Sequence, residues 1–253
     1  MRRRLYVVTG SSRGLGAAVA RQLLGAPAYT LLGVSRRANP ELVRAAAESG
    51  ATCEQWQADL ADPVPVAVRL RDWLARFDAD RFESARLINN AGALAPTGAL
   101  EDAGLDALSA ALRVGLEAPL LLTAAFLAAT ADWTADRRVL NVSSGLGRRA
   151  MAGQATYCAA KAGMDHLSRA VALDQAEKAR GARIVSLAPG VIDTDMQVQL
   201  RSADDAGFPD RANFVELEKT GRLTTPEDTA TRLIAWLERA DFGTTPVADI
   251  REP

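Results

Sequence analysis

The sequence predicts a single α/β domain, residues 1–253, built on one doubly wound parallel sheet of about seven strands with helices on both faces. Three observations support this prediction. Short runs typical of β-strands alternate with helical patterns from one end of the 253-residue chain to the other. Several strand runs are mostly apolar, which is typical of parallel strands covered on both faces. Regular alternation of strand and helix indicates right-handed crossovers between parallel strands.

The elements are expected in turn along the chain. Strands are predicted at residues 5–9, 29–35, 52–58, 85–89, 138–143, 183–188 and 247–250. Helices are predicted at residues 15–24, 40–48, 64–77, 105–131, 155–179 and 226–238. Two of these helices carry clear start signals, because Asp62 precedes Pro63 and Thr225 precedes Pro226. No repeat or linker divides the sequence, so we expect one domain.

Residues 193–222 do not fit the alternation. This segment is polar and charge-rich, and it contains Gly207, Pro209 and Gly221. We interpret it as an insertion over the edge of the sheet that lacks a continuous apolar face. Because little would hold such a segment against the core, we expect a mobile lid over the substrate.

Composition excludes several classes of protein. The formal net charge is −1, from 30 Lys and Arg against 31 Asp and Glu, which argues against a nucleic-acid or membrane-surface partner. Cys53 and Cys158 are too few for a disulfide scaffold, and with His166 they make no zinc site of the usual kind, so no metal is expected. The apolar stretch 119–129 is too short to span a bilayer. We expect a cytoplasmic protein with a small-molecule partner.

A glycine-rich loop follows the first predicted strand and opens the first predicted helix. It contains Thr9, Gly10, Ser11, Ser12, Arg13, Gly14, Leu15 and Gly16. Glycines allow the backbone to approach a pyrophosphate closely, and the N-terminus of the following helix favours the negative charge. Such a loop alone is a weak indication, because glycine loops also simply connect strands to helices. Its place between a strand and a helix favours dinucleotide binding.

Five short motifs occur in order along the chain. They are Thr9-Gly10-x3-Gly14-Leu15-Gly16, Asn89-Asn90-Ala91-Gly92, Ser143-Ser144, Tyr157-x3-Lys161 and Pro189-Gly190. On these motifs the sequence resembles the short-chain dehydrogenase/reductase family over nearly its whole length. The resemblance implies a Rossmann-type domain that binds a nicotinamide dinucleotide.

The expected cofactor contacts come from that resemblance and from the arginines Arg13 and Arg36. They are Gly10, Ser12, Arg13, Gly14, Leu15, Gly16, Arg36, Asp59, Leu60, Asn89, Ala91, Gly92, Tyr157, Lys161, Pro189, Gly190, Ile192 and Thr194. Asp59 resembles the family residue near the adenine, and a role as a turn-capping residue is compatible with that assignment.

The second predicted strand indicates which dinucleotide is bound. A protein that binds the free ribose 2′-hydroxyl usually has an acid after this strand, whereas a 2′-phosphate needs a cation. Here the strand ends in Ser35, Arg36 and Arg37, and Arg13 in the glycine loop is within reach of the same ribose. Guanidinium groups can pair with phosphate oxygens. The arginines could instead be solvated surface charges, but the missing acid favours NADPH/NADP as the cofactor.

Tyr157 and Lys161 are the expected catalytic pair. Four residues apart on a helix, they share one face. The lysine ammonium and a positive nicotinamide ring are expected to lower the pKa of the tyrosine, which can then protonate a carbonyl oxygen. Ser144 ends a strand and is expected to bind the same oxygen. Ser143 is the neighbouring alternative, and the spacing found in the family favours Ser144.

The predicted helix 105–131 departs from the family at Gly115. Many relatives carry an asparagine there, which helps to kink this helix and to hold a water that links the lysine to solvent. Glycine can relax the helix but offers no side-chain amide. The departure therefore puts the proton relay in question and leaves the hydride chemistry in place.

Within the family, three segments most resemble sepiapterin reductase and the bacterial benzil reductases. They are the runs 157–163, 187–197 and 249–252. Those relatives reduce a carbonyl beside another carbonyl, so the expected substrate is a pterin side chain or an α-diketone. Ser144, Tyr157, Gly190 and Asp249 are the expected substrate residues. Asp249 matches the aspartate that anchors the pterin amino group, although it could equally be a polar residue of the terminus.

Two other functions stay open at this stage. One is an NADP-dependent alcohol dehydrogenase working oxidatively, and the other is a non-catalytic NADPH-binding sensor or scaffold. Retention of both Tyr157 and Lys161 favours the enzyme over the sensor. The predicted helices 105–131 and 155–179 are apolar around much of their surface, which requires a second partner for each. The family pairs these helices across a two-fold axis, so we expect a homodimer, or a tetramer made from dimers.

Overall fold

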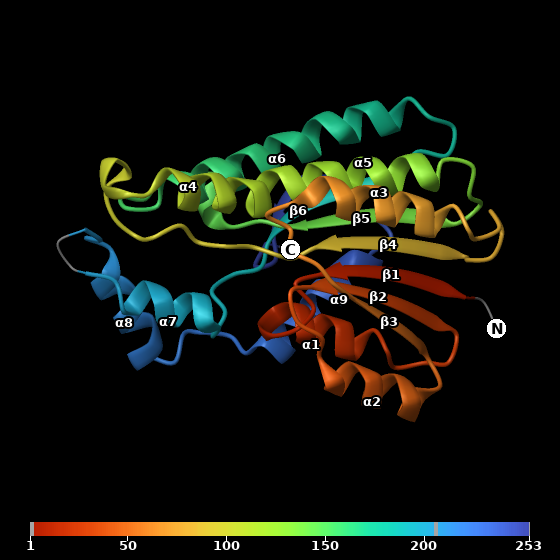
Figure 1. Cartoon of the computed structure of the whole chain (residues 1–253), viewed down its shortest axis with the longest axis horizontal. Helices are drawn as coiled ribbons and strands as arrows, with labels where there is room; N and C mark the ends of the chain where they lie inside the picture. The colour runs from red at the N-terminus through yellow and green to blue at the C-terminus, as the bar shows by residue number, and fades with distance from the viewer. Residues whose placement is uncertain (1–2, 205–206, 253) are drawn as a thin grey trace.

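The sheet confirms the predicted fold class. The computed structural model describes residues 3–204 and 207–252. Its strands are all parallel and lie in the order β3-β2-β1-β4-β5-β6-β7 (Figure 1). They are β1 (Arg4–Thr9), β2 (Tyr29–Ser35), β3 (Thr52–Gln57), β4 (Ser84–Asn89), β5 (Asp136–Val142), β6 (Arg183–Ala188) and β7 (Val247–Asp249). The chain reverses its direction of winding between β1 and β4, and ligands of such sheets bind at that point.

Helices cover both faces of the sheet. One face carries α1 (Gly14–Gln22), α2 (Pro40–Ser49) and α9 (Pro226–Glu238), and the other carries α3 (Pro63–Leu74), α5 (Ala118–Ala129) and α6 (Ala155–Ala176). Because successive side chains of a strand point to opposite faces, β1 contributes to both cores. Leu5 and Val7 pack with α3 and α5, while Tyr6 and Val8 pack with α1 and α9.

The predicted helix 105–131 is divided by a π-helical turn. It consists of α4 (Leu105–Leu112), the π-helical turn η2 (Arg113–Glu117) and α5. The N–H of Ala118 donates to the carbonyl of Arg113, five residues back. Pro119 follows immediately and has no N–H, so the carbonyl of Gly115 lacks the donor that a regular α-helix would supply. Single π-turns of this kind often lie at functional sites.

The combined helix from α4 to α5 is longer than the apolar stretch 119–129 that the sequence interpretation considered. From Leu105 to Ala129 it is long and apolar enough to cross a membrane by length and composition, whereas the stretch 119–129 alone is too short. Its buried side chains, including Ala118, Leu122 and Phe126, belong to the core on the α3 side of the sheet. A core helix meets the same test of length and composition. Here one side of the helix packs in the core, while Leu105, Leu112 and Leu120 are exposed.

The segment 193–222 contains two helices that the sequence interpretation missed. They are α7 (Asp195–Arg201) and α8 (Arg211–Lys219), and they lie beyond the carboxyl ends of the strands rather than over the sheet edge (Figure 1). Residues 205 and 206 lie outside the described residues. Leu200 and Phe208 are buried and pack with Met151 in a small separate core. The segment therefore has a small apolar anchor, which corrects the expectation that little would hold it against the rest of the domain.

Candidate active site

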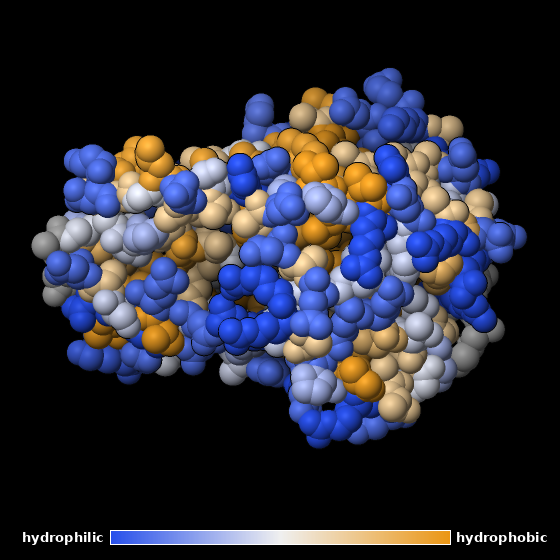
Figure 2. Space-filling model, viewed as in Figure 1, coloured by the Kyte–Doolittle hydropathy of each residue, from blue (hydrophilic) through white to orange (hydrophobic). Residues whose placement is uncertain are grey.

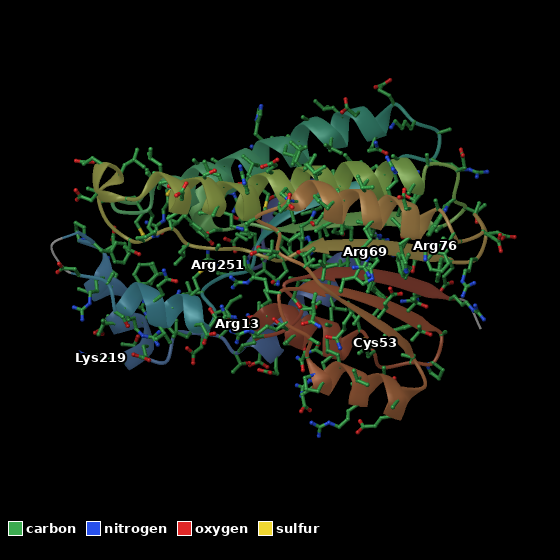
Figure 3. The ribbon with its side chains drawn as sticks, viewed as in Figure 1. Arg13, Cys53, Arg69, Arg76, Lys219 and Arg251 are labelled. Atoms are coloured by element: carbon green, nitrogen blue, oxygen red, sulfur yellow. The ribbon has the colours of Figure 1, made fainter. Side chains whose placement is uncertain are left out.

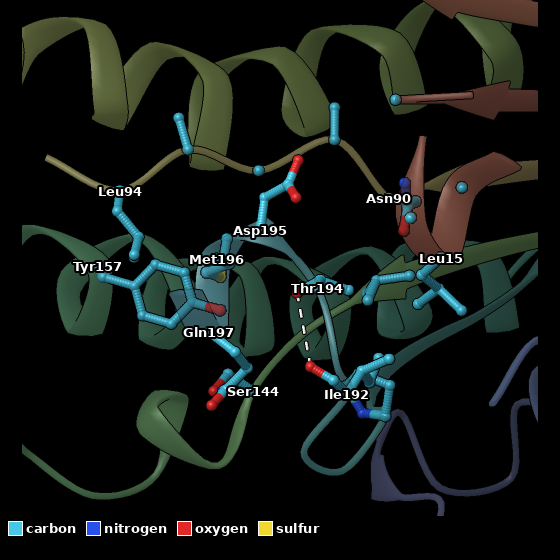
Figure 4. Close-up of a pocket in the computed structure, with 18 of the residues that line it drawn as sticks. Leu15, Asn90, Leu94, Ser144, Tyr157, Ile192, Thr194, Asp195, Met196 and Gln197 are labelled. Atoms are coloured by element: carbon cyan, nitrogen blue, oxygen red, sulfur yellow. Dashed lines mark hydrogen bonds between the residues drawn. The ribbon is translucent and has the colours of Figure 1, made fainter. Parts of the chain in front are cut away.

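A pocket of about 950 Å³ opens at the carboxyl ends of the strands (Figure 4). Its walls come from the glycine loop, the ends of β2, β4, β5 and β6, the helix α6 and the start of α7. Every expected cofactor residue except Asn89 lines this pocket. Ser144, Tyr157 and Gly190 line it as well, so the pocket brings together most of the residues that the sequence singled out.

The glycine loop forms a cradle that side chains would fill. Gly10 and Gly14 have φ of +70° and +53°, a backbone region that glycine enters at no steric cost. A Cβ on Gly16 would lie 2.2 Å from the carbonyl oxygen of Gly10. Arg13 is the N-cap residue of α1 and makes no side-chain capping bond, so side chains leave the first N–H groups of α1 open. The loop fits the pyrophosphate of a dinucleotide.

Asn90, rather than Asn89, lines the pocket beside this loop. The Asn90 Nδ2 donates to the carbonyl of Thr9 at 2.9 Å, and the Thr9 hydroxyl accepts from the N–H groups of Asn90 and Ala91, each at 3.0 Å. Asn89 is buried and donates to Asn141 Oδ1 at 2.8 Å. Asn89 therefore supports the core of the sheet, which corrects its assignment as a cofactor contact.

The end of the pocket near β2 is basic. Arg36 and Arg37 line it together with Asp59 and Leu60. Asp59 also accepts from the N–H of Ala61 at 2.9 Å, which is the turn-capping role that the sequence left open. No acid stands at the end of β2, where Ser35 is followed by Arg36 and Arg37. The Ser35 hydroxyl donates to the carbonyl of Arg37.

Arg13 reaches across the pocket to the lid. Its guanidinium forms an ion pair with Asp195, the first residue of α7. Both side chains are largely exposed, so the pair contributes little to stability. The pair nevertheless links the glycine loop to α7 across the pocket. A cofactor phosphate that entered the pocket would compete with Asp195 for the Arg13 guanidinium.

Tyr157 and Lys161 come from α6 and face Ser144 at the end of β5. Lys161 is buried, and its Nζ donates to the carbonyl of Val142 at 2.7 Å and lies 5.5 Å from the centre of the Tyr157 ring. The Ser144 Oγ accepts from the N–H of Leu146 at 3.2 Å. Ser143 instead donates its hydroxyl to Asp165 at 2.6 Å, which leaves Ser144 as the available hydroxyl.

The electrostatics of the pair differ from the expectation. Burial raises the pKa of the Tyr157 hydroxyl above its ordinary value, and a hydrogen bond with Ser144 opposes that rise. Burial also lowers the pKa of Lys161 to about 8, against the raising effect of Asp165. In the protein alone, Tyr157 is therefore a neutral hydroxyl. The sequence interpretation expected a lowered pKa for Tyr157, but it counted a positive nicotinamide ring in addition to the Lys161 ammonium.

Gly115 lies within the π-turn and packs against the catalytic helix. It is buried, and a Cβ at this position would lie 3.0 Å from the Cβ of Ala160. Ala160 immediately precedes Lys161. An asparagine here would require α6 to shift by a few tenths of an ångström, so the close helix contact accounts for the glycine.

Asp249 lies behind Arg251, which lines the pocket. Its carboxylate accepts from Arg251 Nε at 2.8 Å and Nη2 at 2.6 Å, and also from the Arg251 N–H. Arg251 lines the pocket, whereas Asp249 is not among the lining residues. Figure 3 places Arg251 and Arg13 between the sheet and α7. To anchor a substrate amino group, Asp249 would first have to release this arginine.

The rest of this end of the pocket is mostly apolar, and the sequence interpretation did not single it out. These residues are Leu94, Leu146, Met151, Met196, Leu200 and Phe214, with Arg149, Gln154 and Gln197 among them. Figure 4 draws Leu94, Met196 and Gln197 in the same view as Tyr157 and Ser144. Three of the apolar residues, Met196, Leu200 and Phe214, come from helices α7 and α8 of the segment that the sequence interpretation treated as irregular. No local motif marks them, because only the fold brings them to the pocket.

A doubly wound sheet with a glycine cradle and a Ser-Tyr-Lys set in one pocket is the architecture of a short-chain dehydrogenase. Residues 4–205 match the short chain dehydrogenase family, and the chain belongs to the short-chain dehydrogenase/reductase family. Its members are oxidoreductases that act on CH–OH or C=O groups with NAD(H) or NADP(H).

Three relatives show how near the resemblance is. A benzil reductase ((S)-benzoin forming) from Bacillus cereus is 36% identical over 239 residues, which are 94% of this chain and 96% of the relative. The sepiapterin reductase of Rattus norvegicus is 30% identical over 246 residues, or 93% and 92% of the two chains. A crystal structure of a short-chain dehydrogenase/reductase from Burkholderia vietnamiensis is 37% identical with a TM-score of 0.65, and covers 99% and 98%.

Proposed function

We propose that the chain is an NADPH-dependent carbonyl reductase that reduces a ketone, in particular one carbonyl of a vicinal dicarbonyl compound. The observation that carries the proposal is the presence of a neutral tyrosine hydroxyl, a serine hydroxyl and a buried lysine in one pocket. They belong to Tyr157, Ser144 and Lys161. When bound, the nicotinamide cofactor supplies the hydride.

The residues of the pocket have separate tasks in this reaction. The Ser144 and Tyr157 hydroxyls bind the carbonyl oxygen, and Tyr157 donates the proton that this oxygen needs as the hydride arrives at carbon. The raised pKa of Tyr157 keeps the hydroxyl protonated at neutral pH. The Lys161 ammonium stabilises the phenolate that remains, and its hydrogen bond to Val142 fixes its position. This protonation state supports reduction over the oxidative alternative.

The substrate class is supported by the relatives and by the lining. Benzil carries two adjacent carbonyl groups, and sepiapterin carries a side-chain ketone beside a hydroxyl-bearing carbon. The reductases named for them resemble this chain over almost its full length. The apolar lining around Leu94, Met151 and Phe214 suits an aromatic diketone. Asp249 is already paired with Arg251, which makes an aromatic diketone the better candidate than a pterin.

A test of the function is a screen of NADPH oxidation with matched carbonyl compounds. It would compare an aromatic α-diketone, an aliphatic α-diketone, a pterin with a ketone side chain and a monoketone of similar size. We expect the highest kcat/KM with the aromatic diketone. Activity only with alcohols and NADP would favour the oxidative alternative. NADPH binding without turnover of any of these compounds would favour the non-catalytic sensor.

The preference for NADPH is a specific prediction. Arg36 lines the pocket after β2, and no acid takes its place, so NADPH is expected to bind more tightly than NADH. The change Arg36→Ala is expected to weaken NADPH binding about 10- to 100-fold, because a hydrogen bond to a charged group is lost, and to leave NADH binding nearly unchanged. Cofactor fluorescence titrations measure both constants.

The control for this prediction is Arg44→Ala. Arg44 is an exposed arginine on α2 that pairs with Glu41 and does not line the pocket. It is expected to change neither constant. Equal affinities of the unchanged protein for NADPH and NADH would disprove the preference.

The lid is proposed to order when ligands bind. The segment 193–222 is anchored by Leu200 on α7 and by Phe208, while no residue of α8 is buried. We expect the amide hydrogens of α8 to exchange faster than those of α6 in the free protein. With NADP and a diketone bound, their exchange is expected to slow, since closure excludes water from the pocket. Hydrogen exchange measured by mass spectrometry checks this, and full protection without ligand would contradict it.

The assembly is proposed to be a homodimer, with a tetramer made from dimers as the larger form. Helices α4, α5 and α6 expose large apolar side chains, among them Leu105, Leu112, Leu120 and Leu173. Figure 2 shows hydrophobic residues gathered on the surface over α3 and α5. A second copy of the chain would cover the exposed apolar side chains of α4, α5 and α6. Sedimentation velocity would show whether the protein is a dimer in solution. A cytoplasmic location stays a prediction from the composition.

A further inference from the structure

Asp165 is a buried carboxylate directly beneath the active site. It lies on α6, one turn after Lys161, and only 2% of its surface is exposed. Its Oδ1 accepts hydrogen bonds from the hydroxyls of Ser143 and Ser186, both at 2.6 Å. Its Oδ2 is buried without a hydrogen bond from any described residue and lies 3.4 Å from the Nε of Arg148.

These contacts join the elements that carry the site. Ser143 precedes Ser144 at the end of β5, and Ser186 lies on β6, three residues before Pro189. The 3-10 turn η3 (Gly145–Gly147), whose N-cap residue is Ser144, lies close to the same carboxylate. A Cβ on Gly147 would lie 2.8 Å from Asp165 Oδ2 and 3.0 Å from the carbonyl oxygen of Lys161. Asp165 therefore fixes the turn that holds Ser144 against the helix that holds Lys161.

The charged groups that face Asp165 come from two elements. Lys161 is on its own helix, and Arg148 approaches from the turn after η3. From β5 and β6 the carboxylate receives only hydroxyl groups. On β7, beyond Arg148, Asp249 is paired with Arg251, while Arg148 Nη2 donates to the Ala248 carbonyl at 2.8 Å. A buried carboxylate of this kind is retained only when neighbouring cations and donors compensate its charge.

We propose that Asp165 is a positioning residue for the reaction, which acts through Ser143 on the placement of Ser144 and through its charge on Lys161. The inference rests on the proposed function, since it concerns the same site. The first action is mechanical. Ser143 and Ser144 are adjacent just after the end of β5, so the hydrogen bond that holds Ser143 also restricts the backbone from which the Ser144 side chain projects. The second is electrostatic, because a carboxylate one helical turn away favours the ammonium form of a lysine that burial would otherwise neutralise.

Three variants separate these actions from a merely structural role. Asp165→Asn keeps the size and one acceptor but removes the charge. Arg148→Gln removes the cation that offsets this charge and alters a side chain that is one-third exposed. Asp174→Asn is the control, an exposed acid on the same helix. The first readout is the titration of the Lys161 amine in the protein alone, followed by the NMR shift of its labelled ε-carbon.

The two charge variants are expected to act in opposite directions. Asp165→Asn is expected to lower the pKa of Lys161 by roughly one unit, because a nearby negative charge is lost. Arg148→Gln is expected to raise the pKa of Lys161, because Asp165 then acts on it without an opposing cation. The control is expected to leave it unchanged. Unchanged titration in Arg148→Gln would overturn the electrostatic action even if Asp165→Asn did not fold.

The second readout is the pH profile of kcat for diketone reduction at saturating NADPH. Asp165→Asn is expected to lower kcat at least tenfold and to move the alkaline limb to lower pH. Ser143→Ala is expected to lower kcat without moving that limb, since it keeps the charge and loses the positioning bond. A kcat within twofold of the unchanged protein in Ser143→Ala would overturn the mechanical action. If the unchanged protein reduces no carbonyl, the proposed function fails, while the amine titration still decides the electrostatic action.

Discussion

Replacing Tyr157 with phenylalanine is expected to lower kcat for carbonyl reduction by roughly 100- to 10,000-fold, the usual contribution of a positioned proton donor. The ring stays in place, and only the hydroxyl is removed. NADPH binding is expected to change little, because the glycine cradle and Lys161 are untouched. Single-turnover measurements of NADPH oxidation give the rate, and a fluorescence titration gives the binding constant.

A matched variant tests whether the proton or merely the position is lost. Ser144→Ala removes the other hydroxyl that faces the carbonyl oxygen and is expected to cost less, since Tyr157 can still donate its proton. The two losses are expected not to add in the double variant, because both hydroxyls act on one oxygen. A kcat of Tyr157→Phe close to that of the unchanged protein would remove the tyrosine from the mechanism.

The strands and the catalytic pair were predictable from local pattern. Runs such as Val139–Leu140 and Ile184–Val185 are buried on both faces of the sheet, and strands of this kind are apolar without alternation. The Tyr157–Lys161 spacing depends only on helix geometry, and the glycine loop depends only on its own backbone. Each of these signals lies within a few neighbouring residues, so no knowledge of distant contacts was needed.

The parts that could not be predicted depend on contacts between distant segments. Asn89 and Asn90 are adjacent in one motif, and only the direction of β4 decides that Asn89 meets Asn141 while Asn90 meets Thr9. Alternation along a strand predicts that the side chains of Asn89 and Asn90 point in opposite directions, but it does not predict which of them faces the cofactor. Phe208 packs with Leu200 and Phe214 of its own segment and also with Met151, which is far away in the sequence, so no local pattern marks it as buried.

The electrostatics of Tyr157 depend on three-dimensional burial in the same way. The sequence showed a lysine beside a tyrosine, which alone would lower the pKa of the hydroxyl. In the protein alone, burial raises the pKa of the Tyr157 hydroxyl, and its hydrogen bond with Ser144 only partly opposes that rise. Asp249 shows the same limit, because its partner Arg251 is only two residues away but the sequence cannot say which of them faces the pocket.

Lys161→Met is expected to stabilise the free protein while it abolishes function. The Lys161 side chain is 4% exposed, and burial lowers its pKa from 10.5 to about 8. A lowering of this size costs about 3 kcal/mol of folding free energy while the amine is charged. Methionine fills the same volume without a charge. The change loses the hydrogen bond to the Val142 carbonyl, which offsets about 1–3 kcal/mol of the gain.

The gain is expected to depend on pH with a definite sign. Between pH 8 and 10.5 the unfolded chain holds a proton on Lys161 that the folded protein has released, so the stability of the unchanged protein rises across this window. Methionine removes that dependence. The advantage of Lys161→Met is therefore largest below pH 8, where about 1 kcal/mol or more corresponds to a Tm increase of roughly 2–4 °C, and it disappears towards pH 10.5.

Thermal unfolding of both proteins from pH 6.5 to 10.5 checks this expectation, with Lys178→Met as the control. Lys178 is exposed just beyond the end of α6, so its replacement is expected to change neither Tm nor its pH dependence. Turnover of Lys161→Met is expected to fall at least 100-fold, since the ammonium that stabilises the Tyr157 phenolate is gone. A Lys161→Met protein that is less stable than the unchanged protein at every pH would contradict this expectation, because the hydrogen bond to Val142 and the packing of the lysine would then outweigh the cost of burying its charge.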